Sequence, residues 1–371
     1  MSTNFPIFTP TNRLSLHMKN FPERLKSARL MQGLSLQALA DRMSNLVSKQ
    51  ALSKYEQGAM RPDGEVMTAL CQALDIRSDY LARSVMPALQ EIKFRKLSRL
   101  SAKEQEMAIE RTRDFLQRYM ELESILGEAG IFENPLESMD IQSESDLEAA
   151  AERVRERWQL GKDPIYNVVE FLENRGIKVL EINAHEDFNG MSAFVEKNVP
   201  VIVLNSFLNN VIDRKRFTAL HELGHLLMQR QLECLPEKEQ ERWCNRFAGA
   251  MLLPQDVCRK VLGNKRHHIL LNELILLKEQ FGISPQAAMF RAIHAGIVSA
   301  FYGKSFWQDL SRKGLKKKEI GEFKSSEKAT RFHQLLLRAV SEEIITYSKA
   351  AALNNQKLAE FRQELAAPAL L

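Results

Sequence analysis

The chain has 371 residues, of which 44% are hydrophobic and 27% are charged, and its formal net charge is +5. This length exceeds one ordinary domain, and this composition is typical of folded globular protein, so we expect two or three domains. No apolar stretch reaches the roughly 20 residues that a membrane span needs, and the first residues lack the apolar core of a signal peptide. We therefore expect a cytoplasmic protein with no membrane partner. The four cysteines form no Cys-x-x-Cys pair, which argues against a disulfide framework.

Residues 21–84 contain apolar positions that repeat at helical spacing between turn residues. The stretch FPERLKSARLMQ has the pattern of a helix, and Ser35 is placed to cap the next one, LQALADRM. Ser48 can cap KQALSKYEQG, and Gly64 precedes a last apolar-periodic stretch, EVMTALCQALDI. The spacing predicts four or five short helices joined by tight turns. A small helical bundle without a DNA-binding role would explain this spacing of apolar residues equally well.

The order of residue types in this region resembles the helix-turn-helix domain of the XRE (lambda-repressor-like) family. The resemblance rests on SLQALADRM followed by VSKQALSKYEQGAMRP. It implies a DNA-binding domain at 21–84 whose partner is a double-stranded DNA operator. By motif position, Lys49, Gln50 and Lys54 would face base edges, and Ser48 would cap the recognition helix near a phosphate. Glutamine can pair with adenine and lysine can donate to guanine, so these side chains suit the task.

One departure from the family lies between the two central helices of this region. Ser44-Asn45-Leu46 stands where the family usually has a single glycine. We therefore expect a longer turn, which changes the angle at which the recognition helix leaves it.

Residues 85–145 are predicted as a linker helix followed by a linker. In LSAKEQEMAIERTRDFLQRYMELESIL, Ser101 and Glu104 form a capping box, and an apolar stripe runs along an otherwise polar helix. The stripe either packs on neighbouring helices or pairs with a second copy of the chain. Because helix-turn-helix proteins usually read two half-sites as dimers, we expect a homodimer. The following GEAGIFENPLESMDIQSESD is rich in Gly, Pro, Ser and acidic residues, as linkers are.

A different pattern begins near residue 146. Helices are predicted at about 146–159 and 164–175, followed by three short runs rich in β-branched residues, IKVLEI, GMSAFVEK and VPVIVLN. These runs predict a small sheet, and the helical run VIDRKRFTALHELGHLLM follows it directly. Its His221 and His225 are four residues apart, just over one helical turn. Both imidazoles can therefore leave from one face of a helix and hold one metal ion, with Glu222 alongside.

A catalytic zinc site holds three protein ligands and leaves a fourth position to water, so the two histidines need a further ligand. The helix predicted in EKEQERWCNRFAGAMLLP carries three candidate carboxylates, Glu237, Glu239 and Glu241. Cys244 of the same helix is a minor rival. A histidine pair at this spacing also arises by chance in a packed helix, so the pattern alone leaves the site open.

This region resembles the ImmA/IrrE family of metallopeptidases over roughly residues 164–300. NRFA at 245–248 and LLP at 252–254 match the family's Asn-x-Phe-Ala run and the end of its helix. The resemblance implies a zincin-like α+β metallopeptidase domain at 146–300 that binds Zn²⁺ with a gluzincin-like ligand set. The residues that it implies are His221, His225 and Glu241 as zinc ligands, Asn245 as a support for a ligand, and Glu222 as the catalytic base.

Residues 301–371 combine a basic stretch, which includes RKGLKKK at 312–318, with amphipathic helices. Fused members of the ImmA/IrrE family carry similar RF-x-x-L-x-x-RA and SKAA runs. The resemblance implies a helical regulatory or assembly module. The whole chain is thus predicted to be mainly α with a small β-sheet, an α+β fold with an all-α N-terminal domain.

These patterns together predict a DNA-binding transcriptional regulator with a zinc-dependent endopeptidase domain. The resemblance implies that the substrate is a partner protein, either a repressor or an antitoxin-like regulator. The alternative is a non-proteolytic transcription factor or antitoxin-like regulator whose zinc domain senses a ligand or a partner. Glu222 separates the two hypotheses, because a sensor needs the metal ligands and has no use for a proton shuttle.

Overall fold

The computed structural model describes residues 20–83, 100–128, 130–195, 199–315 and 318–366. These residues form two compact units: unit 1 contains 20–83, 100–128 and 332–366, and unit 2 contains the described residues of 130–331. Residues 85–99 of the predicted linker, residues 196–197 of a predicted strand and residues 316–317 of the basic cluster lie outside the described residues. The four predicted domains stay a prediction, because the two units group segments by contact and not by function.

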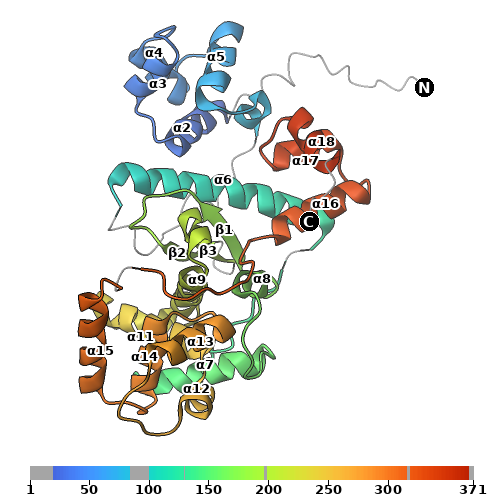
Figure 1. Cartoon of the computed structure of the whole chain (residues 1–371). Helices are drawn as coiled ribbons and strands as arrows, with labels where there is room; N and C mark the ends of the chain where they lie inside the picture. The colour runs from blue at the N-terminus through green and yellow to red at the C-terminus, as the bar shows by residue number, and fades with distance from the viewer. Residues whose placement is uncertain (1–19, 84–99, 129, 196–198, 316–317, 367–371) are drawn as a thin grey trace. The chain divides into compact units, whose positions relative to one another are not determined.

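The N-terminal bundle, residues 20–83 of unit 1, consists of five short helical segments around a small apolar core (Figure 1). Leu25, Leu39 and Leu52 are fully buried in this core because they lie on the inner faces of three successive helices. The segments are α2 (Phe21–Met31), α3 (Leu36–Arg42), α4 (Lys49–Glu56), α5 (Gly64–Leu74) and the 3-10 segment η1 (Ser78–Ala82).

The turn between α3 and α4 contains two residues with left-handed backbone. Ser44 and Asn45 have φ angles of 54° and 57°, and asparagine tolerates this conformation better than most residues. The Asn45 N–H donates to Ala40 O at 2.9 Å, which closes α3. Ser48 Oγ accepts from Ala51 N–H at 3.2 Å, which confirms the predicted N-cap of α4. The turn is therefore an ordered connection that sets where α4 begins.

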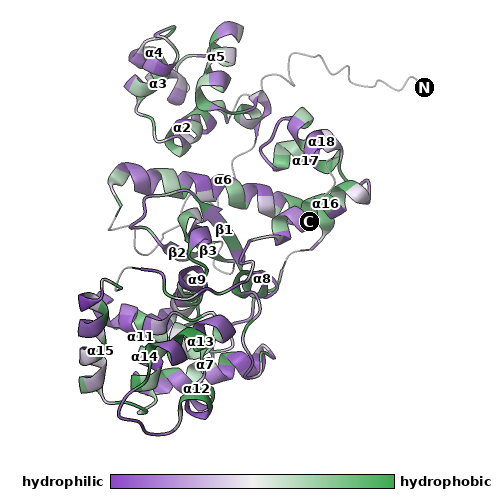
Figure 2. Cartoon of the chain, in the orientation of Figure 1, coloured by the Kyte–Doolittle hydropathy of each residue, from purple (hydrophilic) through white to green (hydrophobic). Residues whose placement is uncertain are grey.

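Helix α6 (Ala102–Leu126) is the long amphipathic helix of unit 1 and alternates hydrophobic and hydrophilic residues along its length (Figure 2). Its start has the predicted capping box. Ser101 Oγ accepts from the Glu104 N–H, and the Glu104 carboxylate accepts from the Ser101 N–H at 2.9 Å. The middle and the end of the helix carry the apolar residues Leu116, Tyr119 and Leu122, all fully buried.

Helices of the same chain cover this apolar stripe. Helix α2 packs on α6, and so do the three C-terminal helices α16 (Arg331–Ser341), α17 (Tyr347–Leu353) and α18 (Leu358–Ala366) through a shared apolar cluster (Figure 1). Phe332, Leu336 and Phe361 lie in this cluster with Tyr119 and Leu122. Of the two predicted alternatives for the stripe, packing within the chain is therefore the one found. The homodimer stays a prediction, now without support from α6.

Unit 2 contains the small sheet. Strands β1 (Lys178–Ile182), β2 (Gly190–Val195) and β3 (Val199–Asn205) pair in the order β1-β3-β2. Strand β1 is parallel and β2 antiparallel to β3. The central strand β3 is buried along nearly its whole length, and hydrophobic residues dominate β1 (Figure 2). The mainly helical chain with this three-stranded sheet confirms the predicted α+β class.

The helices of unit 2 pack on the sheet and on one another. Helix α9 contacts all of β2, β3 and α8, and helix α11 lies between α9 and α7. The predicted helix at 164–175 is shorter than expected, because Asn167 caps it by accepting from Glu170 N–H at 3.0 Å and Gly176, with a φ of 79°, follows its end. The helical segments are α7 (Asp146–Arg157), α8 (Val168–Glu173), η3 (Ser206–Asn210), α9 (Ile212–Leu227), α10 (Gln229–Leu232), α11 (Glu237–Leu252), α12 (Gln255–Leu262), α13 (Leu271–Phe281), α14 (Pro285–His294) and α15 (Ala300–Arg312).

Part of the segment predicted as a linker belongs to the core of unit 2. Leu136 and Ile141 are buried among the apolar residues of the helices. Asn134 Nδ2 donates to Leu227 O, the last residue of α9, at 2.9 Å. The Gly, Pro and Ser content of this segment therefore reflects turns in a packed connection.

The first half of α9 carries two cations without exposed side-chain area, Lys215 and Arg216. Lys215 Nζ pairs with Glu181 on β1 at 2.7 Å. Arg216 pairs with the equally buried Glu327, and the other carboxylate oxygen of Glu327 accepts from Val168 N–H at 2.8 Å. These contacts hold the start of α9 on β1, on α8 and on the segment around Glu327.

We expect Glu327→Gln to lower the free energy of unfolding of unit 2 by about 3–5 kcal/mol, because the buried guanidinium of Arg216 then lacks its carboxylate. All three tryptophans of the chain, at 158, 243 and 307, lie in unit 2, so tryptophan fluorescence during urea unfolding reports on this unit. The exposed Glu322 of the same segment supplies a matched control, Glu322→Gln. Equal free energies of unfolding for the two variants would show that the Glu327 carboxylate does not stabilise the buried Arg216.

Candidate DNA-binding surface and metal centre

The outer face of α4 carries the residues that the sequence predicts to contact DNA. Lys49, Gln50 and Lys54 are exposed, and Ser48 caps the start of the helix. Lysine and glutamine side chains on a free helix face can reach base edges in a major groove. Leu46 is also exposed, by 46%, in the turn that leads into α4. The structure therefore leaves this helix face open for a ligand.

The only acidic residue of α4, Glu56, is held away from this face. Arg29 of α2 donates to both carboxylate oxygens of Glu56, at 2.6 and 2.9 Å, and also to Leu34 O at 2.7 Å. This two-pronged contact fixes the end of α4 on α2 and neutralises a charge that would repel phosphates. No local spacing pattern in the sequence indicates this pair, because Arg29 and Glu56 are 27 residues apart.

Helices α9 and α11 bring three candidate metal ligands together. His221 and His225 come from consecutive turns of α9, and Glu241 comes from the first half of α11. His221 Nε2 lies 3.2 Å from His225 Nε2. Glu241 Oε1 lies 3.2 Å from His225 Nε2, and Glu241 Oε2 lies 3.6 Å from His221 Nε2. Among the described residues, this is the one group of at least three His, Cys, Asp or Glu side chains arranged to share an ion.

These separations fit a tetrahedral zinc ion. Nitrogen and oxygen ligands at about 2.0–2.1 Å from zinc lie about 3.4 Å from one another when the geometry is tetrahedral. The two histidine Nε2 atoms lie 3.2 Å apart, and one carboxylate oxygen of Glu241 lies 3.2 Å from His225 Nε2, both near this value. The other carboxylate oxygen lies 3.6 Å from His221 Nε2. Two imidazoles and one carboxylate also form a donor set that zinc prefers and that leaves a fourth position open. The residues present therefore fit the ion that the sequence predicts.

Two neighbouring side chains orient the site. Asn245, one turn after Glu241 on α11, has its Oδ1 2.9 Å from His221 Nδ1. A ligating histidine usually donates its other ring N–H in this way, which directs Nε2 toward the metal. On the other side, Ser192 of β2 donates from Oγ to Glu222 Oε2 at 2.8 Å. Both Ser192 and Glu222 are buried.

Ser192 is a site residue that was not predicted from the sequence. The signal was present, since Ser192 is the one hydroxyl in the apolar strand GMSAFV, but the strand pattern alone does not say which helix faces it. Its hydrogen bond holds one carboxylate oxygen of Glu222. Glu222 directly follows His221 on α9 and does not belong to the group of converging ligand atoms.

The rival ligands lie elsewhere on α11. Glu237 is exposed in the first turn, and Cys244 is buried in the contact with α9. A Cβ on Gly224 of α9 would lie 3.4 Å from Cys244 and 3.2 Å from Phe247, so glycine at this position lets the two helices approach closely. This close approach brings Glu241 within reach of the two histidines.

The comparisons with known proteins define the class of the two regions. Residues 25–81 match a family model described as helix-turn-helix, and residues 172–292 match one described as IrrE N-terminal-like domain. The chain therefore combines an XRE-type helix-turn-helix domain with an IrrE/ImmA-like domain of the M78 peptidase family. The first match lies within the N-terminal bundle, and the second contains all four of His221, Glu222, His225 and Glu241.

One relative is the SPbeta prophage-derived uncharacterized HTH-type transcriptional regulator YonR of Bacillus subtilis (strain 168). It is 36% identical over 63 residues, which are 17% of this chain and 56% of that protein. This chain thus spans little more than half the length of that relative. No solved structure matches the chain. Among the described residues, no helix is both long enough and apolar enough to cross a membrane.

Proposed function

We propose that this chain is a DNA-binding transcriptional regulator whose IrrE/ImmA-like domain is a zinc-dependent endopeptidase. The observation that carries the proposal is the arrangement around α9, where three ligand atoms converge beside a buried carboxylate that is not one of them. A purely structural zinc site has four protein ligands, whereas a site with three leaves room for water and substrate. Glu222 then has a chemical task that a structural or sensory site would not require.

The roles of the side chains follow from their positions. His221, His225 and Glu241 would hold the zinc ion, and Asn245 would keep the His221 ring in its ligating orientation. A bound zinc ion would lower the pKa of a water molecule to about 7 and would polarise a carbonyl oxygen. Glu222 accepts the proton of the attacking water and passes it to the leaving amine of the cleaved peptide bond. Ser192 keeps Glu222 in place for both transfers.

Strand β2 supports an extended peptide as the substrate. It stands at one end of the strand order and carries Ser192, which contacts Glu222. A peptide that adds to the edge of a sheet gains main-chain hydrogen bonds, and its side chains alternate between the two faces. Such a peptide beside β2 would pass close to Glu222. We propose that it belongs to a partner regulatory protein, a repressor or an antitoxin-like regulator, that meets this chain in the cytoplasm near its operator.

The DNA-binding part is tested on α4. We expect the combined Lys49→Ala, Gln50→Ala and Lys54→Ala variant to stay folded and to lose specific operator binding, because exposed side chains are removed and no core residue is touched. Titration at several salt concentrations should also give a shallower salt dependence than that of the parent chain. A control substitution at the exposed Lys304 of unit 2 should leave operator binding unchanged. Unchanged operator binding by the triple variant would indicate that another basic surface contacts the DNA.

The hydrolytic part is tested by the half-life of the partner protein in cells that carry the parent chain or Glu222→Gln. The proposal requires a longer half-life with the variant while the operator remains occupied. If the partner protein has the same half-life with both chains, and the parent chain contains zinc, the sensory alternative is favoured.

A further inference from the structure

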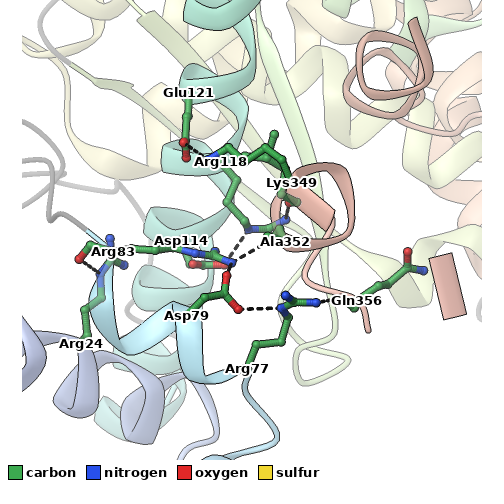
Figure 3. Close-up of polar contacts among 11 residues, drawn as sticks. Arg24, Arg77, Asp79, Arg83, Asp114, Arg118, Glu121, Lys349, Ala352 and Gln356 are labelled. Carbon is green, nitrogen blue, oxygen red and sulfur yellow. Dashed lines mark hydrogen bonds and ion pairs between the residues drawn. The ribbon is translucent and has the colours of Figure 1, made fainter. Parts of the chain in front are cut away.

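The C-terminal end of α17 and the turn after it, in unit 1, accept hydrogen bonds from three arginine side chains of residues 77–118 (Figure 3). Arg83, just after η1, donates to Ala352 O at 2.9 Å. Arg118 of α6 donates to Leu353 O at 2.7 Å, and Arg77, just before η1, donates to Gln356 O at 2.9 Å. Ala352 and Leu353 are the last residues of α17, and carbonyl groups there carry the negative end of the helix dipole, so cations are matching donors.

Two carboxylates hold these arginines in place. Asp79 of η1 accepts from Arg77 Nε at 2.6 Å and from Arg83 Nη2 at 3.1 Å (Figure 3). Asp114 of α6 accepts from Arg118 Nε at 2.9 Å. Each guanidinium thus contacts a carboxylate of its own region and a main-chain carbonyl between residues 352 and 356. A guanidinium suits this double task because its donors have a fixed planar arrangement.

Further contacts tie η1 to α6 and α6 to α17. Arg24 of α2 donates to Gln117 of α6 and to Arg83 O, the latter at 3.3 Å. The guanidinium groups of Arg24 and Arg83 lie 5.3 and 5.7 Å from the centre of the buried Tyr80 ring. Lys349 of α17 pairs with Glu121 of α6. The N-terminal bundle, α6 and the C-terminal helices therefore share one continuous set of contacts.

We propose that the C-terminal helices α16 to α18 are an intramolecular partner of the helix-turn-helix domain, and that operator binding depends on them. The proposal rests on the proposed operator binding through α4. The arginine contacts lie on η1 and α6, and Lys49, Gln50 and Lys54 remain exposed, so the C-terminal helices support the domain and do not cover its DNA-binding face. When the arginine contacts are lost, η1 is held less firmly, and only a fraction of the molecules keep the arrangement that binds the operator. The apparent affinity for the operator then falls by that fraction.

The test replaces Arg77, Arg83 and Arg118 together with lysine in the full-length chain. Lysine keeps the charge, and so the general attraction to DNA, but its donors all lie on one nitrogen at the end of a flexible chain and lack the fixed planar arrangement of the guanidinium. We expect about tenfold weaker operator binding with an unchanged salt dependence. Amide exchange should become faster in both η1 and α17, while tryptophan fluorescence, which reports on unit 2, stays the same. The matched control is Arg362→Lys on the exposed side of α18.

A milder pair of variants covers the case in which the triple variant fails to fold. Lys349→Glu places two carboxylates together at Glu121, and adding Glu121→Lys restores an opposite-charge pair. We expect roughly two- to fivefold weaker operator binding for the first change and recovery in the double variant. Faster exchange in α17 alone, with parental operator affinity, would overturn the inference and leave the proposed function standing. A parent chain that binds no operator would instead remove the proposed function itself.

Discussion

Purified His221→Ala, His225→Ala and Glu241→Ala variants are expected to lose most of their zinc, whereas the parent chain should hold about one ion per chain. Each change removes one of three ligand atoms that lie within 4.8 Å of one another. Two remaining ligands bind zinc far more weakly than three, whichever of the three is removed. Metal analysis after gel filtration measures the zinc content, and tryptophan fluorescence checks that unit 2 remains folded.

Two controls separate Glu241 from its rivals. Glu237→Ala removes an exposed carboxylate of the same helix, and Cys244→Ser removes the buried thiol next to Gly224. Both should keep parental zinc content. Full zinc content in Glu241→Ala together with a loss in Cys244→Ser would contradict the assigned ligand set.

Glu222→Gln is expected to abolish hydrolysis while leaving zinc and operator binding in place. The glutamine amide has nearly the shape of the carboxylate, and it can still accept the hydrogen bond from Ser192 that Glu222 accepts at 2.8 Å. It cannot take a proton from water, so the general base is lost, and such a base contributes roughly 10²–10⁴-fold to a rate. Because Glu222 is not among the converging ligand atoms, the metal content should stay parental.

Substitutions on the DNA-binding surface are expected to have the opposite effects on operator binding and hydrolysis. The triple alanine variant of Lys49, Gln50 and Lys54 should lose operator binding and keep hydrolysis, if the two domains act independently. A Glu222→Gln variant that loses zinc would mean that Glu222 acts as a ligand. If Glu222→Gln regulates its target as the parent chain does while His221→Ala does not, the metal is structural or sensory.

Local patterns in the sequence predicted much of the fold. The caps at Ser48 and Ser101, the presence of three strands after α8 and the start of α7 at Asp146 follow from residues within a few positions of one another. The histidine pair was also predictable from local spacing, since four residues correspond to about one helical turn. Glu241 was not predictable in this way, because its position depends on how closely α11 approaches α9 at Gly224. Only the family resemblance selected it among three glutamates.

Contacts between distant residues could not be predicted in this way. Arg216 and Glu327 are 111 residues apart, and Ser192 reaches Glu222 from a strand 30 residues earlier. Arg83 and Ala352 are 269 residues apart, so the sequence does not indicate that the last helices join the first ones. The same lack of long-range information made the stripe on α6 compatible with a dimer, although helices of the same chain cover it.

The central claim, a zinc-dependent endopeptidase joined to a DNA-binding domain, is tested most directly by the new protein N-termini that the chain produces. These can be compared by mass spectrometry in cells that express the parent chain, Glu222→Gln or His221→Ala at equal levels. We expect at least one cleaved regulatory protein that is present with the parent and absent with both variants. The same set of N-termini in all three cultures, with parental zinc content in Glu222→Gln, would contradict it.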